Sequence, residues 1–336
     1  LKLGLAMAAQ RRYAEAEISL RKAVDSEPNN SDALTAMGMV LARQHRFNEA
    51  IGVFRRIVGL KPESADAYMN LGVVLADKGV KEEASREFEK AVQLAPRSGQ
   101  ANFQLGRVLF DLRRYEDARA ALETADELIP DDPAVLRSLG MTLNRLEQRP
   151  QAIALLRRSI ALQPRHDASH EELGRALLAL DQPREGIASL KRAVEINPRN
   201  SAATATLLTT LYRARSDEVS QYRAQMSELK REEAATSRAK VLSNFSLAAA
   251  ELENWSRALL QLEEAVEVCA GCPIQALLHK NLGLILWKSG DLLGAVEQLQ
   301  TARSLAPDDP DILYALNAAK AASNAVGASQ KARESQ

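Results

Sequence analysis

The chain has 336 residues, and its 44 basic residues balance its 44 acidic residues. This balance gives no bulk electrostatic attraction to nucleic acid or to an anionic membrane surface. No apolar run reaches the roughly 18 residues that a membrane-spanning helix needs. Alanine, leucine, glutamate and arginine are abundant while aromatic residues make up only 4%, so the composition indicates an all-helical protein.

A glycine recurs every 34 residues through the first two hundred positions. It stands at six places, Gly4, Gly38, Gly72, Gly106, Gly140 and Gly174. A small residue follows each glycine 12 positions later, and a proline follows 24 positions later, beginning with Ala16 and Pro28. A fixed period of this length is typical of a solenoid, in which each unit packs only against its neighbours.

The segment 31–64 shows how one unit is built. Its apolar residues recur at helical spacing in two runs, which a short polar break at 44–46 separates. Pro62 ends the second run, because proline cannot continue a helix. Gly38 lies in the middle of the first helix, where glycine costs about 1 kcal/mol relative to alanine. We therefore expect Gly38 to permit close approach of the second helix at Ala50.

This pattern resembles the tetratricopeptide repeat. The likeness rests on the glycine and on four residues at fixed distances after it, as in Gly72, Ala84, Phe88, Ala91 and Pro96. The resemblance covers nearly the whole chain. It implies an all-α, right-handed superhelical solenoid of antiparallel helix pairs. It also implies a non-catalytic scaffold that binds a peptide or protein segment on its concave face, which the first helices of the units line.

Six regular units occupy residues 1–200, and the pattern then becomes irregular. The unit 201–238 has Leu208 where glycine is expected and lacks the closing proline. It is four residues longer than the others, which predicts a second helix lengthened by about one turn. This charge-dense helix is either a long, partly solvated packing helix or a dedicated partner-binding helix.

Two further units follow at 239–309, and the first of them has Ser246 in the glycine position. We expect a terminal helix at 310–322. The segment 323–336 is small and polar, so we expect a disordered tail there. The chain begins inside an apolar helical pattern at Leu1, and we expect upstream residues, such as a signal peptide, an anchor or a fused domain, to belong to the natural protein.

The two cysteines, Cys269 and Cys272, lie in a loop between helices and are followed by Pro273. A haem attachment motif needs a histidine after the second cysteine, and a zinc site needs two further ligands at suitable spacing. We therefore expect neither group. Two alternatives stay open: a disulfide, worth roughly 2 kcal/mol at most, and two free thiols. A disulfide favours an extracytoplasmic location, periplasmic or secreted, over a cytoplasmic one.

The sequence shows no constellation that carries catalysis. No serine–histidine–aspartate set, phosphate-binding loop or carboxylate pair stands out from the repeat pattern. We therefore expect no catalytic residues, no metal and no cofactor. The expected partners are proteins or peptides, without nucleic acid and without a membrane span in this chain.

Arginines and aromatic residues cluster at the inward-facing positions that the resemblance implies. The candidate peptide-binding residues are Phe103, Arg107, Phe110, Arg137, Arg145, Glu171, Arg175, Tyr212 and Arg213. Arginine beside an aromatic ring suits a carboxylate-bearing segment, through bidentate hydrogen bonds and stacking. The alternative is that these arginines are paired with acidic neighbours such as Asp111 or Glu171.

A structural role is the second functional hypothesis. The first helix, 1–9, is almost wholly apolar, and the last helix carries Ile312, Leu313 and Leu316. Solenoids need polar terminal caps to stay soluble, so two apolar ends predict end-to-end homo-oligomers. Such heterologous contacts form open filaments when they do not close. A third hypothesis is an accessory subunit fused to or bound on an enzyme.

Overall fold

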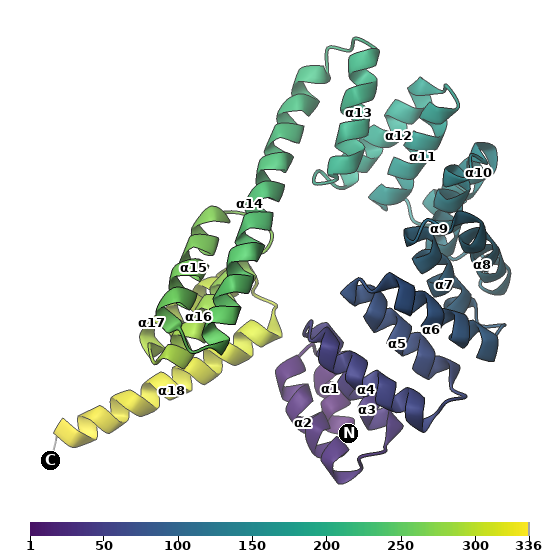
Figure 1. Ribbon diagram of the computed structural model, residues 1–336. Helices are drawn as coiled ribbons and strands as arrows, with labels where there is room; N and C mark the ends of the chain where they lie inside the picture. Colours follow the sequence, from purple (N-terminus) through teal and green to yellow (C-terminus); the bar gives the residue numbers. More distant parts are fainter. Residues whose placement is uncertain (335–336) are drawn as a thin grey trace. The chain divides into compact units, whose positions relative to one another are not determined.

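The computed structural model describes the backbone of residues 1–334 and the side chains of residues 1–325. Within these residues the chain forms eighteen α-helices and no strand (Figure 1). Short connections join the helices, and each helix from α3 to α13 (residues 31–213), and from α15 to α18 (residues 255–334), packs against the next one along the chain. The fold is a helical repeat solenoid, as the repeat period predicts.

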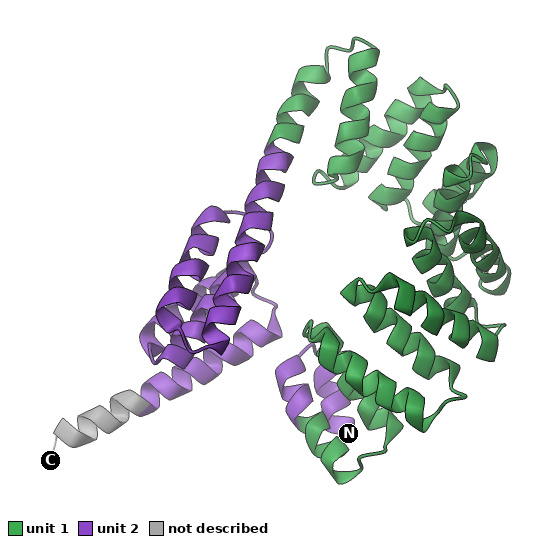
Figure 2. Cartoon of the chain, viewed as in Figure 1, with its two compact units in different colours: residues 1, 19–227 green, residues 2–18, 228–336 purple. Residues whose placement is uncertain are grey.

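The chain divides into two compact units, which Figure 2 distinguishes by colour. The first unit comprises Leu1 and residues 19–227. Its helix pairs are α3 (Ser31–Arg43) with α4 (Phe47–Leu60), α5 (Ala65–Lys78) with α6 (Lys81–Leu94), α7 (Gly99–Asp111) with α8 (Tyr115–Leu128), α9 (Pro133–Arg145) with α10 (Arg149–Leu162), and α11 (Asp167–Ala179) with α12 (Pro183–Ile196). The helix α13 (Ser201–Arg213) packs against α12.

The second unit comprises residues 2–18 together with 228–336. Its helices are α1 (Lys2–Ala9), α15 (Trp255–Val268), α16 (Gln275–Ser289), α17 (Leu292–Leu305) and α18 (Pro310–Glu334). Two helices, α2 (Tyr13–Ser26) and α14 (Val219–Glu251), are divided between the units. No helix in the described part of the chain has the length and hydropathy needed to cross a bilayer.

The repeated glycines lie where the two helices of a pair approach most closely. A methyl group added at Gly106 would lie 2.5 Å from Leu122 Cγ and 3.2 Å from the Ala118 carbonyl oxygen. At Gly72 the obstacle is the ring of Phe88, at 2.7 Å. The glycine therefore permits the close approach that the sequence predicts. At both positions the first atoms met belong to the residue 16 positions later, and at Gly106 the backbone 12 positions later is next.

Ser246 replaces the glycine of its repeat without separating the helices. Its side chain is fully buried, and its hydroxyl donates a hydrogen bond of 2.7 Å to the carbonyl oxygen of Ala258, which lies 12 residues later on α15. The hydrogen bond satisfies a polar group that would be costly to bury alone. The serine thus contacts the same backbone position that the glycines approach.

Two helix ends differ from the sequence prediction. The lengthened helix was expected to end near residue 238, but α14 runs unbroken from Val219 to Glu251. No proline or glycine lies between Val219 and Glu251, so nothing ends the helix where proline ends the corresponding helices. The backbone of α18 likewise continues past residue 322 to Glu334. The last two residues of the expected tail lie outside the described residues.

A side-chain cap begins the first helix of most pairs. Asn30, Ser64, Ser98, Asp132 and Asn200 recur at the 34-residue spacing, and each accepts a hydrogen bond from a backbone N–H in the first turn of its helix. Such caps stabilise a helix by about 1 kcal/mol. His166 occupies the same position before α11 and makes no capping hydrogen bond.

Candidate functional site

A pocket of about 230 Å³ lies on the first helices of successive pairs, mainly α7 and α9, with one lining residue from α11. Its lining residues are Arg107, Phe110, Asp111, Arg137, Ser138, Met141 and Ala168. Arg107, Phe110 and Asp111 share one face of α7, because side chains three and four residues apart lie together on a helix. Three of the predicted binding residues, Arg107, Phe110 and Arg137, therefore meet at one pocket.

Neither arginine of this pocket is neutralised by a carboxylate among the described residues. Arg107 donates a hydrogen bond of 3.2 Å to Gln104 and lies over the ring of Phe103, with Cζ 5.6 Å from the ring centroid. Arg137 contacts the imidazole of His166 at 3.2 Å. The one acidic lining residue, Asp111, forms an ion pair with Lys81 at 3.5 Å. The two guanidinium groups of the pocket therefore form no direct ion pair with a carboxylate among the described residues.

The two guanidinium groups influence each other. Burial, and then the positive charge of Arg107, lower the pKa of Arg137 from its ordinary value. Burial disfavours the charged form, and a neighbouring like charge does the same. The carboxylates of Asp132 and Asp167 act in the opposite direction. Arginine stays protonated in proteins, so Arg107 and Arg137 repel each other in the folded protein.

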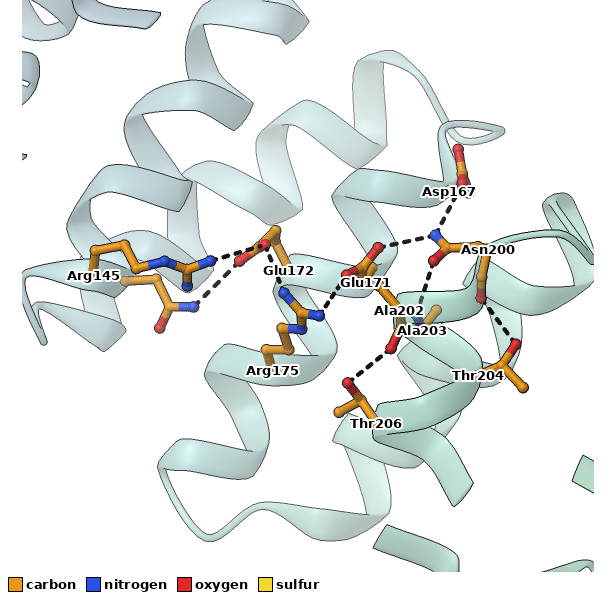
Figure 3. Close-up of polar contacts among 11 residues, drawn as sticks. Arg145, Asp167, Glu171, Glu172, Arg175, Asn200, Ala202, Ala203, Thr204 and Thr206 are labelled. Atoms are coloured by element: carbon orange, nitrogen blue, oxygen red, sulfur yellow. Dashed lines mark hydrogen bonds and ion pairs between the residues drawn. The ribbon is translucent and has the colours of Figure 1, made fainter. Parts of the chain in front are cut away.

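Two further arginines of the cluster, Arg145 and Arg175, have acidic partners. Arg175 pairs with Glu171 at 2.9 Å and with Glu172 at 3.3 Å, and Arg145 approaches Glu172 at 3.7 Å. Glu171 also accepts a hydrogen bond of 2.9 Å from Asn200. Figure 3 shows this chain of contacts from α9 through α11 to α13. The pairing with Glu171 that the sequence analysis gave as the alternative is present for Arg175.

Both carboxylates of this network are buried, with Glu171 8% and Glu172 5% exposed. Buried charges need partners, because each would otherwise carry its full desolvation cost. Asn144 supplies a further, long contact to Glu172 at 3.5 Å. We name these residues, Arg145, Glu171, Glu172, Arg175 and Asn200, the α11 network, and the pocket above the α7–α9 pocket.

The other predicted binding residues neither line the pocket nor belong to the network. The Phe103 ring is 8% exposed and belongs to the apolar core around Leu122 and Val135. Tyr212 is 68% exposed on α13, and Arg213 ends that helix with its side chain exposed. The structure brings neither of the last two into the α7–α9 pocket.

Cys269 and Cys272 are joined by a disulfide in the second unit. Gly271 between them has a φ of +83°, which glycine adopts without steric cost. Both cysteines are buried in an apolar cluster with Ala265 and Leu278. Among the described residues no group of His, Cys, Asp and Glu side chains is arranged to hold a metal ion.

Sequence reasoning missed two features of the first unit. A larger pocket, of about 650 Å³, lies on α3, α4 and α5 and is lined mainly by apolar side chains, including Met39, Phe54 and Val73. Its lining residues are spread over three helices, and no single motif marks them. The second missed feature is the contact of His166 with Arg137. Its signal was present in the sequence as a departure from the 34-residue capping register.

Comparisons with known proteins agree with this architecture. Two segments, residues 138–204 and 244–310, match the tetratricopeptide repeat family, and residues 43–125 match the family described as anaphase-promoting complex, cyclosome, subunit 3. No curated protein matches the chain.

Several solved structures are similar in fold. A structure titled "Functional Characterization of Pseudomonas Aeruginosa pilF" is 21% identical, with a TM-score of 0.53, and the match covers 59% of this chain and 91% of that chain. YrrB, described as a TPR protein with an unusual peptide-binding site, is 22% identical over 56% of this chain and 96% of its own, with a TM-score of 0.48.

Proteins built from these repeats bind peptide or protein partners, and they typically act as non-catalytic scaffolds. The 34-residue register, the helix pairs packed at their glycines and the two family matches lead to one assignment: this chain belongs to the tetratricopeptide repeat family.

Proposed function

We propose that the protein is an interaction scaffold whose α7–α9 pocket binds a carboxylate-bearing segment of a peptide or protein. The observation that carries the proposal is the pair Arg107 and Arg137, which line one pocket without a carboxylate partner among the described residues. Asp132 and Asp167 act against the repulsion between the two guanidinium groups without forming an ion pair with either, and an acidic ligand would pair with both directly.

The geometry supports a carboxylate in particular. A guanidinium group presents its donors in a planar fork that matches the two oxygens of a carboxylate. The ring of Phe110 lines the same pocket and offers an apolar surface for the methylene groups of an acidic side chain. A volume of about 230 Å³ is below the usual range for small-molecule sites, so one or two side chains of an extended segment fill it.

The expected effect of each arginine is measurable. Hydrogen bonds to charged groups contribute about 1.5–3 kcal/mol each, and 1.4 kcal/mol corresponds to a factor of ten in affinity. Loss of both arginines therefore lowers affinity by roughly a hundredfold or more. The attraction is also screened by salt, so it is strongest at low ionic strength.

The experiment uses a fluorescein-labelled tetraglutamate peptide as the probe and fluorescence anisotropy as the readout, at low salt. Saturable binding to the wild type is expected, with none to a tetraglutamine peptide. The double variant Arg107→Glu, Arg137→Glu should lose binding. Arg86→Glu is the matched control, because Arg86 is an exposed arginine on α6, outside the pocket. Equal binding by the double variant and the control would refute the proposal.

End-to-end assembly is the second candidate. Leu3 and Leu5 of α1 are 63% and 47% exposed, which supports a contact at that helix. On α18, Ile312 and Leu316 are each 1% exposed, whereas Leu313 is 40% exposed, so Leu313 alone of these three residues is available for such a contact. Size-exclusion chromatography with negative-stain microscopy distinguishes the candidates: rods favour assembly, and discrete particles favour the scaffold alone.

A further inference from the structure

His166 departs from the capping pattern at the point where the chain enters α11. Residues at the same register position cap the first helices of five other repeats with Asn, Ser or Asp side chains. His166 caps nothing, so α11 forgoes a stabilising interaction that is available to any of those residue types. The imidazole contacts the guanidinium of Arg137 instead, with 3.2 Å between Nε2 and Nη1.

From His166 a series of hydrogen bonds continues to two buried serines and a backbone carbonyl. His166 Nδ1 lies 3.4 Å from Ser169 Oγ, and Ser169 Oγ lies 3.3 Å from Ser159 Oγ. Ser159 donates in turn to the carbonyl oxygen of Pro133 at 2.9 Å. Ser159 and Ser169 are both fully buried, so these contacts supply the partners that buried hydroxyl groups require.

The groups at the two ends of this series of hydrogen bonds determine which atom donates at each step. The Pro133 carbonyl can only accept, so Ser159 donates to it and accepts from Ser169. Ser169 therefore accepts from His166 Nδ1, and the unprotonated Nε2 accepts from Arg137, which can only donate. One tautomer of the neutral imidazole, with the proton on Nδ1, satisfies every member of the chain.

This series of hydrogen bonds begins and ends on the same helix, α9. Arg137 and Pro133 lie four residues apart on α9, His166 and Ser169 lie at the start of α11, and Ser159 lies on α10. The hydrogen bonds therefore connect three helices, and the last of them lies one turn before Arg137. A guanidinium held in this way loses less rotamer freedom when a ligand binds, which favours affinity.

We infer that His166 is a positioning residue that holds the guanidinium of Arg137 toward the α7–α9 pocket, and that it replaces a helix cap for this purpose. The inference rests on the proposed function, because it assigns His166 a role in the same anion site. His166 itself does not line the pocket.

The charges around His166 favour the neutral imidazole that these hydrogen bonds require. Burial and the positive charge of Arg137 lower the pKa of His166, and His170 on α11 acts in the same direction. Asp167 opposes them, but its carboxylate already accepts hydrogen bonds from Asn197 and Asn200, at 2.9 and 3.0 Å.

Two substitutions at His166 separate positioning from a merely structural role. His166→Ser restores the side chain that caps α5 and α7, so its melting temperature should equal or exceed that of the wild type. Its affinity for the tetraglutamate probe should fall by about three- to tenfold, because Arg137 is no longer held. His166→Gln keeps an acceptor and a donor and should retain the wild-type affinity within about twofold.

Different results would overturn the inference about His166 and the proposed function. A His166→Ser variant that binds like the wild type, or one that loses stability and affinity together, overturns the inference. A wild type that does not bind the probe at all refutes the proposed function and leaves the positioning itself to a second measurement.

Nitrogen-15 NMR of the histidine side chains is that measurement, with the His166 signal identified by its absence in His166→Gln. The inference predicts the Nδ1-protonated tautomer at neutral pH. It also predicts a higher titration midpoint for His166 in Arg137→Met, where the neighbouring charge is absent. The Nε2-protonated tautomer, or an unchanged midpoint, would contradict it.

Discussion

The α7–α9 pocket and the α11 network present two ways of placing arginine on the first helices of the repeats. In the pocket, Arg107 and Arg137 have neutral partners, a glutamine and a histidine. In the network, Arg145 and Arg175 lie against the buried carboxylates Glu171 and Glu172. A sequence pattern that treats all four as one binding cluster therefore combines two different electrostatic situations.

The two groups differ in whether their charges are paired within the protein. Partners within the network satisfy its charges, so an added ligand would have to displace them. The pocket holds like charges close together, and the positive charge of Arg107 contributes to lowering the pKa of Arg137. The same residue type therefore stabilises the fold at one place and, we propose, binds an acidic partner at the other.

The largest effect on stability should come from Arg175→Met. This change leaves Glu171 and Glu172 with fewer partners, and removal of one partner from a buried pair typically costs 3–5 kcal/mol. Because the side chain of Arg175 is 31% exposed, solvent screening reduces the cost, and we expect a loss of about 2–3 kcal/mol. Urea unfolding measures it, and a change below about 1 kcal/mol would contradict the account of the network.

Reduction of the Cys269–Cys272 disulfide should have a smaller effect, confined to the second unit. A loop this short contributes roughly 2 kcal/mol at most, so the reduced protein should melt at a modestly lower temperature. The α7–α9 pocket belongs to the first unit, so the affinity for tetraglutamate should not change. Thiol counting with and without reductant verifies the bond, and two reactive thiols in the untreated protein would show that it is absent.

Glu172→Gln should leave arginines of the α11 network with fewer acidic partners, as in the α7–α9 pocket. Removal of this buried carboxylate leaves Arg145 without an ion pair among the described residues and Arg175 with Glu171 alone. The surplus charge should raise the affinity for the acidic probe by about two- to fivefold at low salt. Anisotropy titrations at low and high salt test this, and a gain that persists at high salt would argue against an electrostatic cause.

The smallest effect concerns acid stability. The pKa of His166 in the folded protein is lowered from its ordinary value of 6.5. The unfolded chain therefore binds a proton more readily than the folded chain in this range. His166 thus contributes stability that is fully present above pH 6.5 and is lost as the pH falls through the folded pKa. Urea midpoints across this range should fall less in His166→Gln than in the wild type, and parallel curves would refute this reading.

The fold followed from the sequence wherever one register repeats. Glycine, the small residue and proline at fixed spacing defined the helix pairs, because the steric demand at Gly106 or Gly72 recurs in each unit. The prediction was wrong at α14, where the stop signal at the end of a unit is missing and the helix continues. A pattern derived from regular units does not indicate what the chain does where the pattern lapses.

The helices that carry the arginines were predictable from the sequence, but the partners of the arginines were not. Helical register placed Arg107, Arg137, Arg145 and Arg175 on the first helices of their repeats. Which of them is neutralised depends on contacts between repeats, such as that of Arg145 with Glu172, and periodicity within one helix contains no such information. His166 was visible only as an exception, since its contact with Arg137 joins residues 29 positions apart.

Matched substitution of the two arginines tests the central claim most directly: Arg137→Met and Arg175→Met, each titrated with the labelled tetraglutamate peptide under conditions where both are folded. The account predicts that Arg137→Met loses most of the binding, and that Arg175→Met, which changes only the surrounding charge, weakens it by no more than about two- to fivefold. Equal loss in both variants, or unchanged binding by Arg137→Met, would contradict the distinction between the proposed anion-binding pocket and the network of paired charges.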